Sequence, residues 1–187
     1  MTWDHAEMPN TSDMERLRTV KLLLLDVDGV LTDGTIIYTG SQEESKCFSV
    51  KDGLGIRMLI KAGLAVGIVT GRASDALMRR CRELGIAPVF DGIGDKAAVV
   101  DEVLAASLIE SIQEAAFMGD DLPDIPLMKK AGLAIAVADA HPLVLERADI
   151  ITRAPGGQGA VREICEAMLK AHGLWEAAVG SFLESPP

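Results

Sequence analysis

The chain has 187 residues, 49% of them apolar and 25% charged, which fits one globular domain and excludes disordered, collagen-like and disulfide-scaffold proteins. Its 18 lysines and arginines against 28 aspartates and glutamates give a formal net charge of −10, which argues against a nucleic-acid partner. Three widely spaced cysteines, no secretion signal and no apolar stretch near the roughly 18 residues of a membrane span predict a cytoplasmic protein with no membrane partner.

The first predicted elements are a strand and a hairpin. Residues 1–19 are a polar lead, and the apolar run KLLLLDV at 21–27 then predicts a strand buried on both faces. Residues 34–50 place two β-prone runs around a polar segment that contains Gly40. This pattern predicts a β-hairpin that projects from the main body, with a register that the sequence leaves open.

From Asp52 onward, predicted helices alternate with short apolar strands. Helices are expected near 53–62, 73–84, 95–106, 124–131 and 141–147, and strands at 64–70, 87–90, 115–119, 133–138 and 149–152. A glycine-rich turn, one more amphipathic helix and a tail at 173–187 follow. The alternation predicts an α/β fold, with one domain over 20–172 built on a doubly wound, mostly parallel sheet whose ligand site lies at the carboxyl ends of the strands.

Two carboxylates follow the first predicted strand in the segment DVDGVLTDG at 26–34. Asp26 and Asp28 are two residues apart, a spacing that puts both side chains on the same side of an extended chain. Carboxylates held this close repel each other, so the pair indicates a divalent metal or a shared proton. The alternative is a helix cap and a turn before Gly29, two roles in which aspartate is common.

Phosphate-binding groups follow the next predicted strands. Thr70, Gly71 and Arg72 offer a hydroxyl, a backbone amide and a guanidinium at the start of a helix, and each of these groups suits a phosphate oxygen. Lys96 stands at the start of another predicted helix, where its charge could neutralise a phosphoryl group. A solvated surface lysine is the alternative for that position.

Three more carboxylates begin the helix after the strand at 115–119. They belong to Asp120, Asp121 and Asp124. Helix capping explains one of them and leaves the others unexplained. Five acidic and two cationic side chains are therefore predicted to meet at one edge of the sheet.

The four motifs of the haloacid dehalogenase superfamily of phosphotransferases are present in order, as DVDG at 26–29, Thr70, Lys96 and GDDLPD at 119–124. The chain resembles that superfamily, and the resemblance implies its Rossmann-like fold. It also implies that Asp26 is a nucleophile that becomes an aspartyl phosphate and that Asp28 is a general acid and base. Thr70 and the Gly71 amide would hold phosphoryl oxygens, and Lys96 would stabilise the charge on Asp26 and on the phosphoryl group.

The same resemblance implies Mg²⁺ as the cofactor. Its ligands would be the carboxylates of Asp26 and Asp120 and the backbone carbonyl of Asp28. Asp121 and Asp124 would support these ligands. The physics agrees, because a phosphate dianion cannot approach clustered carboxylates without local cations.

The spacing between motifs predicts that the protein has no cap domain. Only 41 residues separate Asp28 from Thr70 and 25 separate Thr70 from Lys96, whereas larger relatives insert a cap domain in one of these gaps. A capless site lies open, although phosphoryl transfer benefits from a shielded one. We therefore expect a homo-oligomer whose hairpins reach neighbouring sites.

Within the superfamily, the chain most resembles the 3-deoxy-D-manno-octulosonate 8-phosphate phosphatases, from Leu22 to about Met168. The segments that carry this resemblance include FSVKDGLGIRML, MGDDLPDIPLM, AVADAHP and GGQGAVRE. It implies a homotetramer that removes the 8-phosphate from this eight-carbon sugar acid in the synthesis of a lipopolysaccharide precursor. The implied substrate contacts are Asp28, Ser49, Val50, Lys51, Asp52, Gly53, Arg57, Gly71, Arg72, Arg80 and Lys96.

Two alternatives remain open at this point. A phosphatase of nine-carbon sugar acid 9-phosphates, of the sialic or deaminoneuraminic type, would share the fold and every catalytic motif. A noncatalytic phosphosugar-binding or assembly domain is disfavoured, because a decayed site should have lost at least one of the motif residues. Gln158 departs from the pattern, since relatives often carry a basic residue there.

Overall fold

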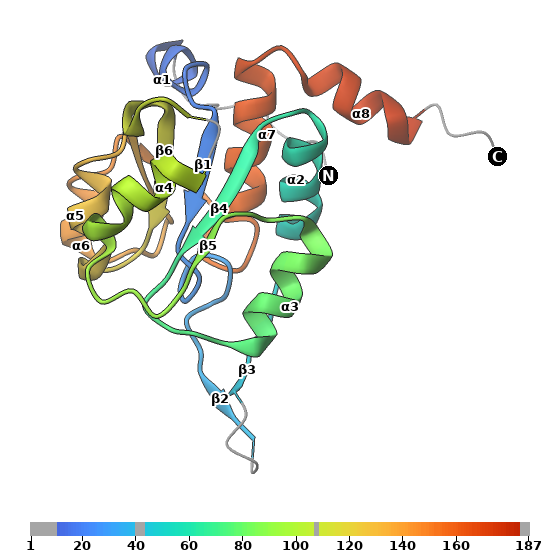
Figure 1. The fold of residues 1–187 in the computed structure, drawn as a ribbon. Helices are drawn as coiled ribbons and strands as arrows, with labels where there is room; N and C mark the ends of the chain where they lie inside the picture. Colours follow the sequence, from blue (N-terminus) through green and yellow to red (C-terminus); the bar gives the residue numbers. More distant parts are fainter. Residues whose placement is uncertain (1–10, 40–43, 107–108, 184–187) are drawn as a thin grey trace.

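Six parallel strands form the central sheet of the computed structural model, which describes residues 11–39, 44–106 and 109–183 (Figure 1). Their order across the sheet is β5-β4-β1-β6-β7-β8. The bounds are β1 Leu22–Leu25, β4 Ala65–Val69, β5 Val89–Phe90, β6 Ala115–Gly119, β7 Leu133–Ala136 and β8 Ile150–Ile151. The predicted doubly wound parallel sheet is confirmed, and each strand lies within the range expected for it.

Strand β1 is the centre of the sheet. Its four leucines are completely buried, as expected for a strand covered on both faces. Leu22 pairs with Ala65 of β4 on one side and with Ala115 of β6 on the other. The chain winds outward from β1 to β5 and then returns to the far side of β1, so the strand order reverses there. Ligand sites of such folds lie at this reversal, beyond the carboxyl ends of the strands.

Helices cover both faces of the sheet (Figure 1). One layer contains α2 (Val50–Lys61), α3 (Asp75–Leu84) and α7 (Ala160–Ala171), and the other contains α4 (Val100–Ala106), α5 (Ile125–Met128) and α6 (Pro142–Leu145). Short 3-10 helices lie at Lys96–Val99, Ile112–Glu114 and Leu122–Asp124. The predicted helices at 95–106 and 124–131 thus begin as 3-10 turns, and the second has only one short α-helical segment.

The predicted hairpin is present and projects from the body of the protein (Figure 1). Its strands are β2 (Ile37–Tyr38) and β3 (Glu44–Ser45), which pair antiparallel with Tyr38 opposite Glu44. The turn around Gly40, at residues 40–43, lies outside the described residues. The described part of the chain between Asp28 and Lys96 forms this hairpin, α2, β4, α3 and β5, and it contains no inserted cap domain.

Both ends of the described chain form helices where a polar lead and a tail were expected. Helix α1 (Thr11–Leu17) packs against α7 and buries Leu17 completely. Helix α8 (Trp175–Leu183) follows α7, and the ammonium of Lys170 lies 5.0 Å from the centre of the Trp175 ring. The rest of the predicted lead and tail, 1–10 and 184–187, lies outside the described residues. No helix in the described ranges has the length and apolar character needed to cross a membrane.

Candidate active site

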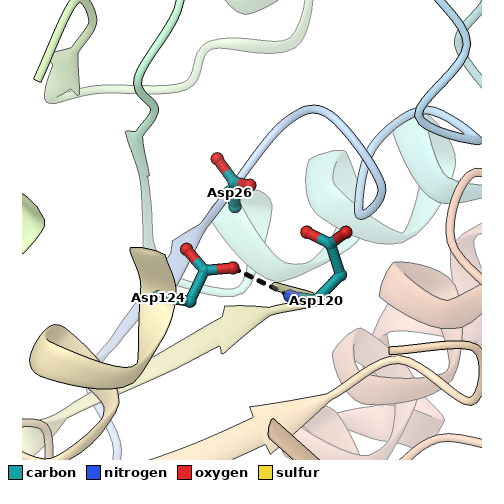
Figure 2. Close-up of side chains that lie close together, drawn as sticks. All are labelled: Asp26, Asp120 and Asp124. Atoms are coloured by element: carbon teal, nitrogen blue, oxygen red, sulfur yellow. Dashed lines mark hydrogen bonds between the residues drawn. The ribbon is translucent and has the colours of Figure 1, made fainter. Parts of the chain in front are cut away.

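Three carboxylates meet at the carboxyl ends of the central strands. Asp26 follows β1, Asp120 follows β6, and Asp124 closes the 3-10 turn after β6. Each of the three has a carboxylate oxygen within 4.8 Å of the others, and Figure 2 shows the side chains grouped around one space. The sheet therefore brings together residues that are almost a hundred positions apart in the sequence.

Two glycines allow this close approach. Gly29 has φ +96° in the turn after β1, and a Cβ atom there would lie 2.1 Å from Oδ2 of Asp120. A Cβ atom at Gly119 would lie 2.5 Å from Oδ2 of Asp124. The turn itself is held by the buried hydroxyl of Thr32, which accepts hydrogen bonds from the N–H groups of Gly29 and Gly34. Larger side chains at either glycine would displace a carboxylate.

Lys96 is buried at the centre of the acidic group. Its Nζ lies 2.8 Å from Oδ1 of Asp26 and 2.5 Å from Oδ1 of Asp124. The other oxygen of Asp124 accepts hydrogen bonds from the N–H groups of Asp120, at 2.8 Å, and Asp121, at 3.1 Å. Asp124 therefore supports both Lys96 and the loop that carries Asp120, and the surface-lysine alternative is wrong for Lys96. The carboxylate of Asp121 accepts from Leu122 N–H and caps the 3-10 turn.

The pKa values of these groups show how strongly the site is charged. Burial, followed by the nearby charge of Asp124, raises the pKa of Asp26 to about 6, against the opposing effect of Lys96. Burial and the charges of Asp26 and Asp124 raise the pKa of Asp120 to about 8. Burial alone would lower the pKa of Lys96, but its two carboxylate partners outweigh that effect and the pKa is raised. One lysine thus does not balance the acidic charge of the site.

The donor set fits a hard divalent cation. Oδ1 of Asp120 is buried and has no hydrogen-bond partner among the described residues. An ionised carboxylate can only accept, and a buried acceptor without a partner is costly unless a proton or a cation satisfies it. Mg²⁺ prefers oxygen ligands, and the carboxylates of Asp26 and Asp120 offer them at this spacing. The residues therefore fit the predicted magnesium ion.

The raised pKa values predict how stability changes with pH in metal-free protein. Between an ordinary pKa of 3.8 and the raised values of about 6 and 8, folded Asp26 and Asp120 bind more protons than the unfolded chain does. Their contribution to stability is therefore present at low pH and is lost as the pH rises through those values. With EDTA present, we expect the Tm to fall more steeply between about pH 5 and pH 8.5 in the wild type than in D120N. Parallel curves for the two proteins would contradict this explanation.

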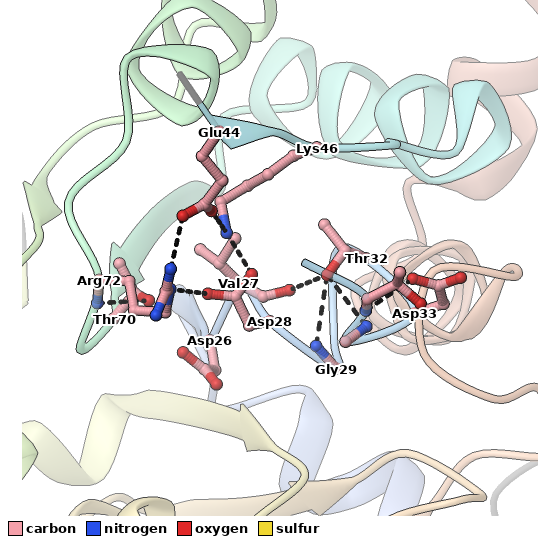
Figure 3. A network of polar contacts seen from close by, with 12 residues as sticks. Asp26, Val27, Asp28, Gly29, Thr32, Asp33, Glu44, Lys46, Thr70 and Arg72 are labelled. Carbon is pink, nitrogen blue, oxygen red and sulfur yellow. Dashed lines mark hydrogen bonds and ion pairs between the residues drawn. The ribbon is translucent and has the colours of Figure 1, made fainter. Parts of the chain in front are cut away.

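Asp28 belongs to a network of charged side chains that includes residues of the hairpin (Figure 3). It forms an ion pair with Lys46, and its Oδ2 lies 3.8 Å from Nε of Arg72. Glu44 binds both of these cations, with contacts of 2.7 Å to Lys46 and 2.5 Å to Nη2 of Arg72. The hydrogen bonds from Lys46 and Arg72 lower the pKa of Glu44. The side chain of Lys46 is 1% exposed, so the base of the hairpin covers Asp28.

Glu44 and Lys46 were not predicted from the sequence. They lie two residues apart in and just after β3, so their side chains share one side of an extended segment, as do those of Asp26 and Asp28. That spacing was the available signal. It was missed because nothing in a single sequence shows which face of a hairpin turns toward the sheet.

The predicted phosphate-binding residues lie beside the aspartates. Thr70, at the end of β4, is almost completely buried, and its Oγ1 accepts a hydrogen bond of 3.5 Å from Arg72 N–H. Figure 3 shows Thr70 and Arg72 next to Asp26 and Asp28. Gly71 lies between them in the same exposed turn. The structure thus brings these residues to the site expected for them.

The start of α2 and Arg80 form a second part of the site. The Arg80 guanidinium donates to the backbone carbonyl of Ser49 at 3.3 Å and lies over the ring of Phe48. A Cβ atom at Gly53 would lie 2.2 Å from Nη2 of Arg80, so glycine makes room for the guanidinium. Lys46, Phe48 and Arg80 line a hollow of about 320 Å³. Since Lys46 also pairs with Asp28, this hollow adjoins the network around Asp28.

Four further predicted substrate contacts differ in their placement. The Asp52 carboxylate accepts from the N–H groups of Gly159, at 3.2 Å, and Arg162, at 2.7 Å. It therefore caps α7, and the geometry does not support a contact of this carboxylate with substrate. Arg57 lies further along α2 and lines a separate groove beside α8. Val50 and Lys51 are exposed on the first turn of α2, and Val50 lines the hollow beside Arg80. The predictions for Val50, Lys51 and Arg57 remain predictions.

Comparison with known sequences gives a consistent result. A family profile described as haloacid dehalogenase-like hydrolase matches residues 89–164. The chain is 44% identical over 167 residues to the 3-deoxy-D-manno-octulosonate 8-phosphate phosphatase of Escherichia coli strain B, covering 89% of this chain and 88% of that protein. It is 46% identical over 168 residues to the enzyme of the same name from Yersinia pestis, covering 89% of each.

Solved structures of such phosphatases also resemble the chain in sequence and fold. The crystal structure of the Yersinia pestis phosphatase has a TM-score of 0.84 and 45% identity, covering 87% of this chain and 88% of that one. The phosphatase of Moraxella catarrhalis, crystallised with a magnesium ion, a phosphate ion and a KDO molecule, has a TM-score of 0.87 and 38% identity. That comparison covers 92% of this chain and 99% of the other.

Proposed function

This chain belongs to the 3-deoxy-D-manno-octulosonate 8-phosphate phosphatases, a family of haloacid dehalogenase-like hydrolases, and we propose how its residues carry out the reaction. It is a Mg²⁺-dependent phosphomonoester hydrolase that converts the sugar acid 8-phosphate to the free sugar acid and phosphate. The nine-carbon alternative and the noncatalytic alternative are not favoured. The observation that carries the proposal is the group formed by Asp26, Lys96 and Asp120 at the carboxyl ends of the central strands, in which Asp26 and Lys96 are buried.

Asp26 is the proposed nucleophile. A carboxylate oxygen attacks phosphorus, the bond from phosphorus to the sugar oxygen breaks, and its electron pair leaves with that oxygen. Lys96, 2.8 Å from Asp26, keeps a positive charge beside the attacking group and the phosphoryl oxygens. Thr70 and the Gly71 amide are proposed to hold those oxygens during the transfer.

Asp28 is the proposed acid and base. It gives a proton to the departing sugar oxygen, and in the second step it takes a proton from the water that attacks phosphorus and releases Asp26. Its contacts with Lys46 and Arg72 fix the position of the carboxyl group (Figure 3). A bound Mg²⁺ would supply charge neutralisation for the phosphoryl group, with Asp26, Asp120 and the Asp28 carbonyl as the proposed ligands.

The acidic sugar is proposed to extend from the aspartates toward the hollow beside Arg80. Arginine binds carboxylates with a planar pair of donors, which suits the acid group of this substrate. Arg80 lines this hollow and Arg72 lies near Asp28, so both arginines are proposed to contact the acid group. This placement is a proposal about the orientation of the substrate.

Phosphate release from two substrates tests the proposed function. With Mg²⁺ present, we expect the eight-carbon acid 8-phosphate to be hydrolysed with a kcat/KM at least about tenfold above that of a nine-carbon acid 9-phosphate. EDTA should abolish both activities, and added Mg²⁺ should restore them. Faster turnover of the nine-carbon substrate would overturn the substrate assignment, and activity that persists in EDTA would overturn the cofactor assignment.

We also propose a homotetramer in which hairpins lie close to neighbouring sites, and a cytoplasmic location. The hairpin carries Ile36, Ile37 and Tyr38, whose side chains are 40%, 40% and 72% exposed. Apolar surface of this kind is typical of an interface between subunits. Sedimentation of the wild type should give a tetramer, and I37D/Y38D should sediment as smaller species. A fully active monomeric wild type would contradict the proposal.

A further inference from the structure

The loop between β7 and α6 contacts the backbone of the three-aspartate group formed by Asp26, Asp120 and Asp124. His141 N–H donates to the backbone carbonyl of Asp120 at 2.7 Å, so this loop holds the chain at the residue with the unpartnered buried oxygen. Two residues earlier, Oδ1 of Asp139 accepts a hydrogen bond of 2.9 Å from Gly156 N–H. The Asp139 carboxylate has no place in the mechanism described above.

Gly156 belongs to a glycine-rich loop that lies directly against the turn after β1. A Cβ atom at Gly156 would lie 1.7 Å from the carbonyl oxygen of Gly29, so only glycine fits there without movement of the backbone. Gly157 N–H donates to the carbonyl of Val30 at 2.9 Å. The position of the Gly29 turn therefore depends on the position of this loop.

The turn at Gly29 also contacts the Asp120 carboxylate, since a Cβ atom at Gly29 would lie 2.1 Å from Oδ2 of Asp120. Contacts therefore connect Asp120 to Gly29, Gly29 to Gly156, and Gly156 to Asp139. His141, in the same loop as Asp139, connects back to Asp120. Closely packed layers transmit small displacements, because protein interiors have few voids that could absorb them.

We propose that Asp139 is a positioning residue for the cation site: by holding Gly156 it presses the glycine loop against the Gly29 turn and keeps the Asp120 carboxylate in place for Mg²⁺. The proposal rests on the proposed function, because it assumes that Mg²⁺ binds at Asp120. Groups that orient metal ligands without touching the metal typically change its affinity by about 10- to 100-fold.

Mg²⁺ binding to the purified full-length chain tests the inference, measured by calorimetry and by the rise in Tm on addition of Mg²⁺. We expect D139A to bind Mg²⁺ about tenfold more weakly than the wild type, with kcat restored to within about threefold at saturating Mg²⁺. D139N keeps an oxygen that can accept from Gly156, so a smaller loss of affinity is expected. This second variant serves if D139A does not fold.

Asp149 provides a matched control, because its Oδ2 accepts a hydrogen bond of 2.8 Å from Ala134 N–H near the opposite ends of the strands. D149A should lower the Tm and leave Mg²⁺ affinity unchanged. Unchanged affinity in D139A, or equal losses of affinity in D139A and D149A, would overturn the inference alone. A wild-type protein that binds no Mg²⁺ would contradict the cofactor of the proposed function and the inference with it.

Discussion

D26N is expected to lower phosphate release by about 10⁴-fold or more, because an amide is a far weaker nucleophile than a carboxylate and the substitution changes little else. The side chain keeps its size and can still accept a hydrogen bond from Lys96. The substitution also removes one negative charge from the acidic group, where burial raises the pKa of Asp26 to about 6. We therefore expect the metal-free variant to unfold at a Tm equal to or above that of the wild type at pH 8.

D33N is the matched control for D26N. Asp33 lies in the same segment but is exposed, and its Oδ1 accepts from Thr35 N–H at 2.9 Å. We expect its activity to remain within about twofold of the wild type, as is usual for surface substitutions. Both variants are assayed for phosphate release at saturating substrate and Mg²⁺. Retention of more than about a hundredth of wild-type activity by D26N would contradict the nucleophile assignment.

K96M is expected to damage both stability and activity. Methionine preserves most of the side-chain volume but leaves Asp26 and Asp124 facing each other without their shared cation. Removal of one partner from a buried ion pair typically costs about 3–5 kcal/mol. For a chain of this size, each kcal/mol corresponds to about 2–4 °C in Tm. Loss of a charge aimed at the phosphoryl group should also reduce kcat by about 100-fold or more.

The pH dependence of the Tm of K96M distinguishes the loss of charge at position 96 from a simple packing defect. At about pH 5 the carboxylates that face position 96 bind protons more readily, so the loss of Tm in K96M should be smaller than at pH 8. K129M, which replaces an exposed lysine, should match the wild type in Tm and in kcat. An equal loss of Tm in K96M at both pH values would show that charge at Lys96 does not explain its effect.

The fold could be predicted well because its signals are local and strong. The run of leucines in β1, the alternation of helices and strands, and the turn residues between them all predict the same doubly wound sheet. The grouping of the candidate site residues was also predictable, since the carboxyl ends of parallel strands meet at one edge. Asp26, Lys96 and Asp120 accordingly lie together, and the relatives confirm the predicted family.

The remaining features depend on packing that a single sequence does not show. Asp52 stands in a segment expected to contact substrate, yet its carboxylate caps α7, a helix more than 100 positions later. Lys46 is buried in an ion pair with Asp28, which lies 18 positions earlier in the chain. Helix α1 forms in a polar stretch because Leu17 is buried by tertiary contacts. Secondary-structure propensity is too weak to predict such contacts.

The covalent step can be observed by mass spectrometry after rapid acid quenching of enzyme mixed with excess sugar acid 8-phosphate and Mg²⁺. D28N is tested beside the wild type, because Asp28 is the proposed acid for formation of the phosphoryl-enzyme as well as the proposed base for its hydrolysis. We expect the mass of one added phosphoryl group in the intact chain, located by peptide mapping at Asp26 and absent from D26N. A phosphoryl group on a different residue, or none in either protein while phosphate is being released, would contradict the account.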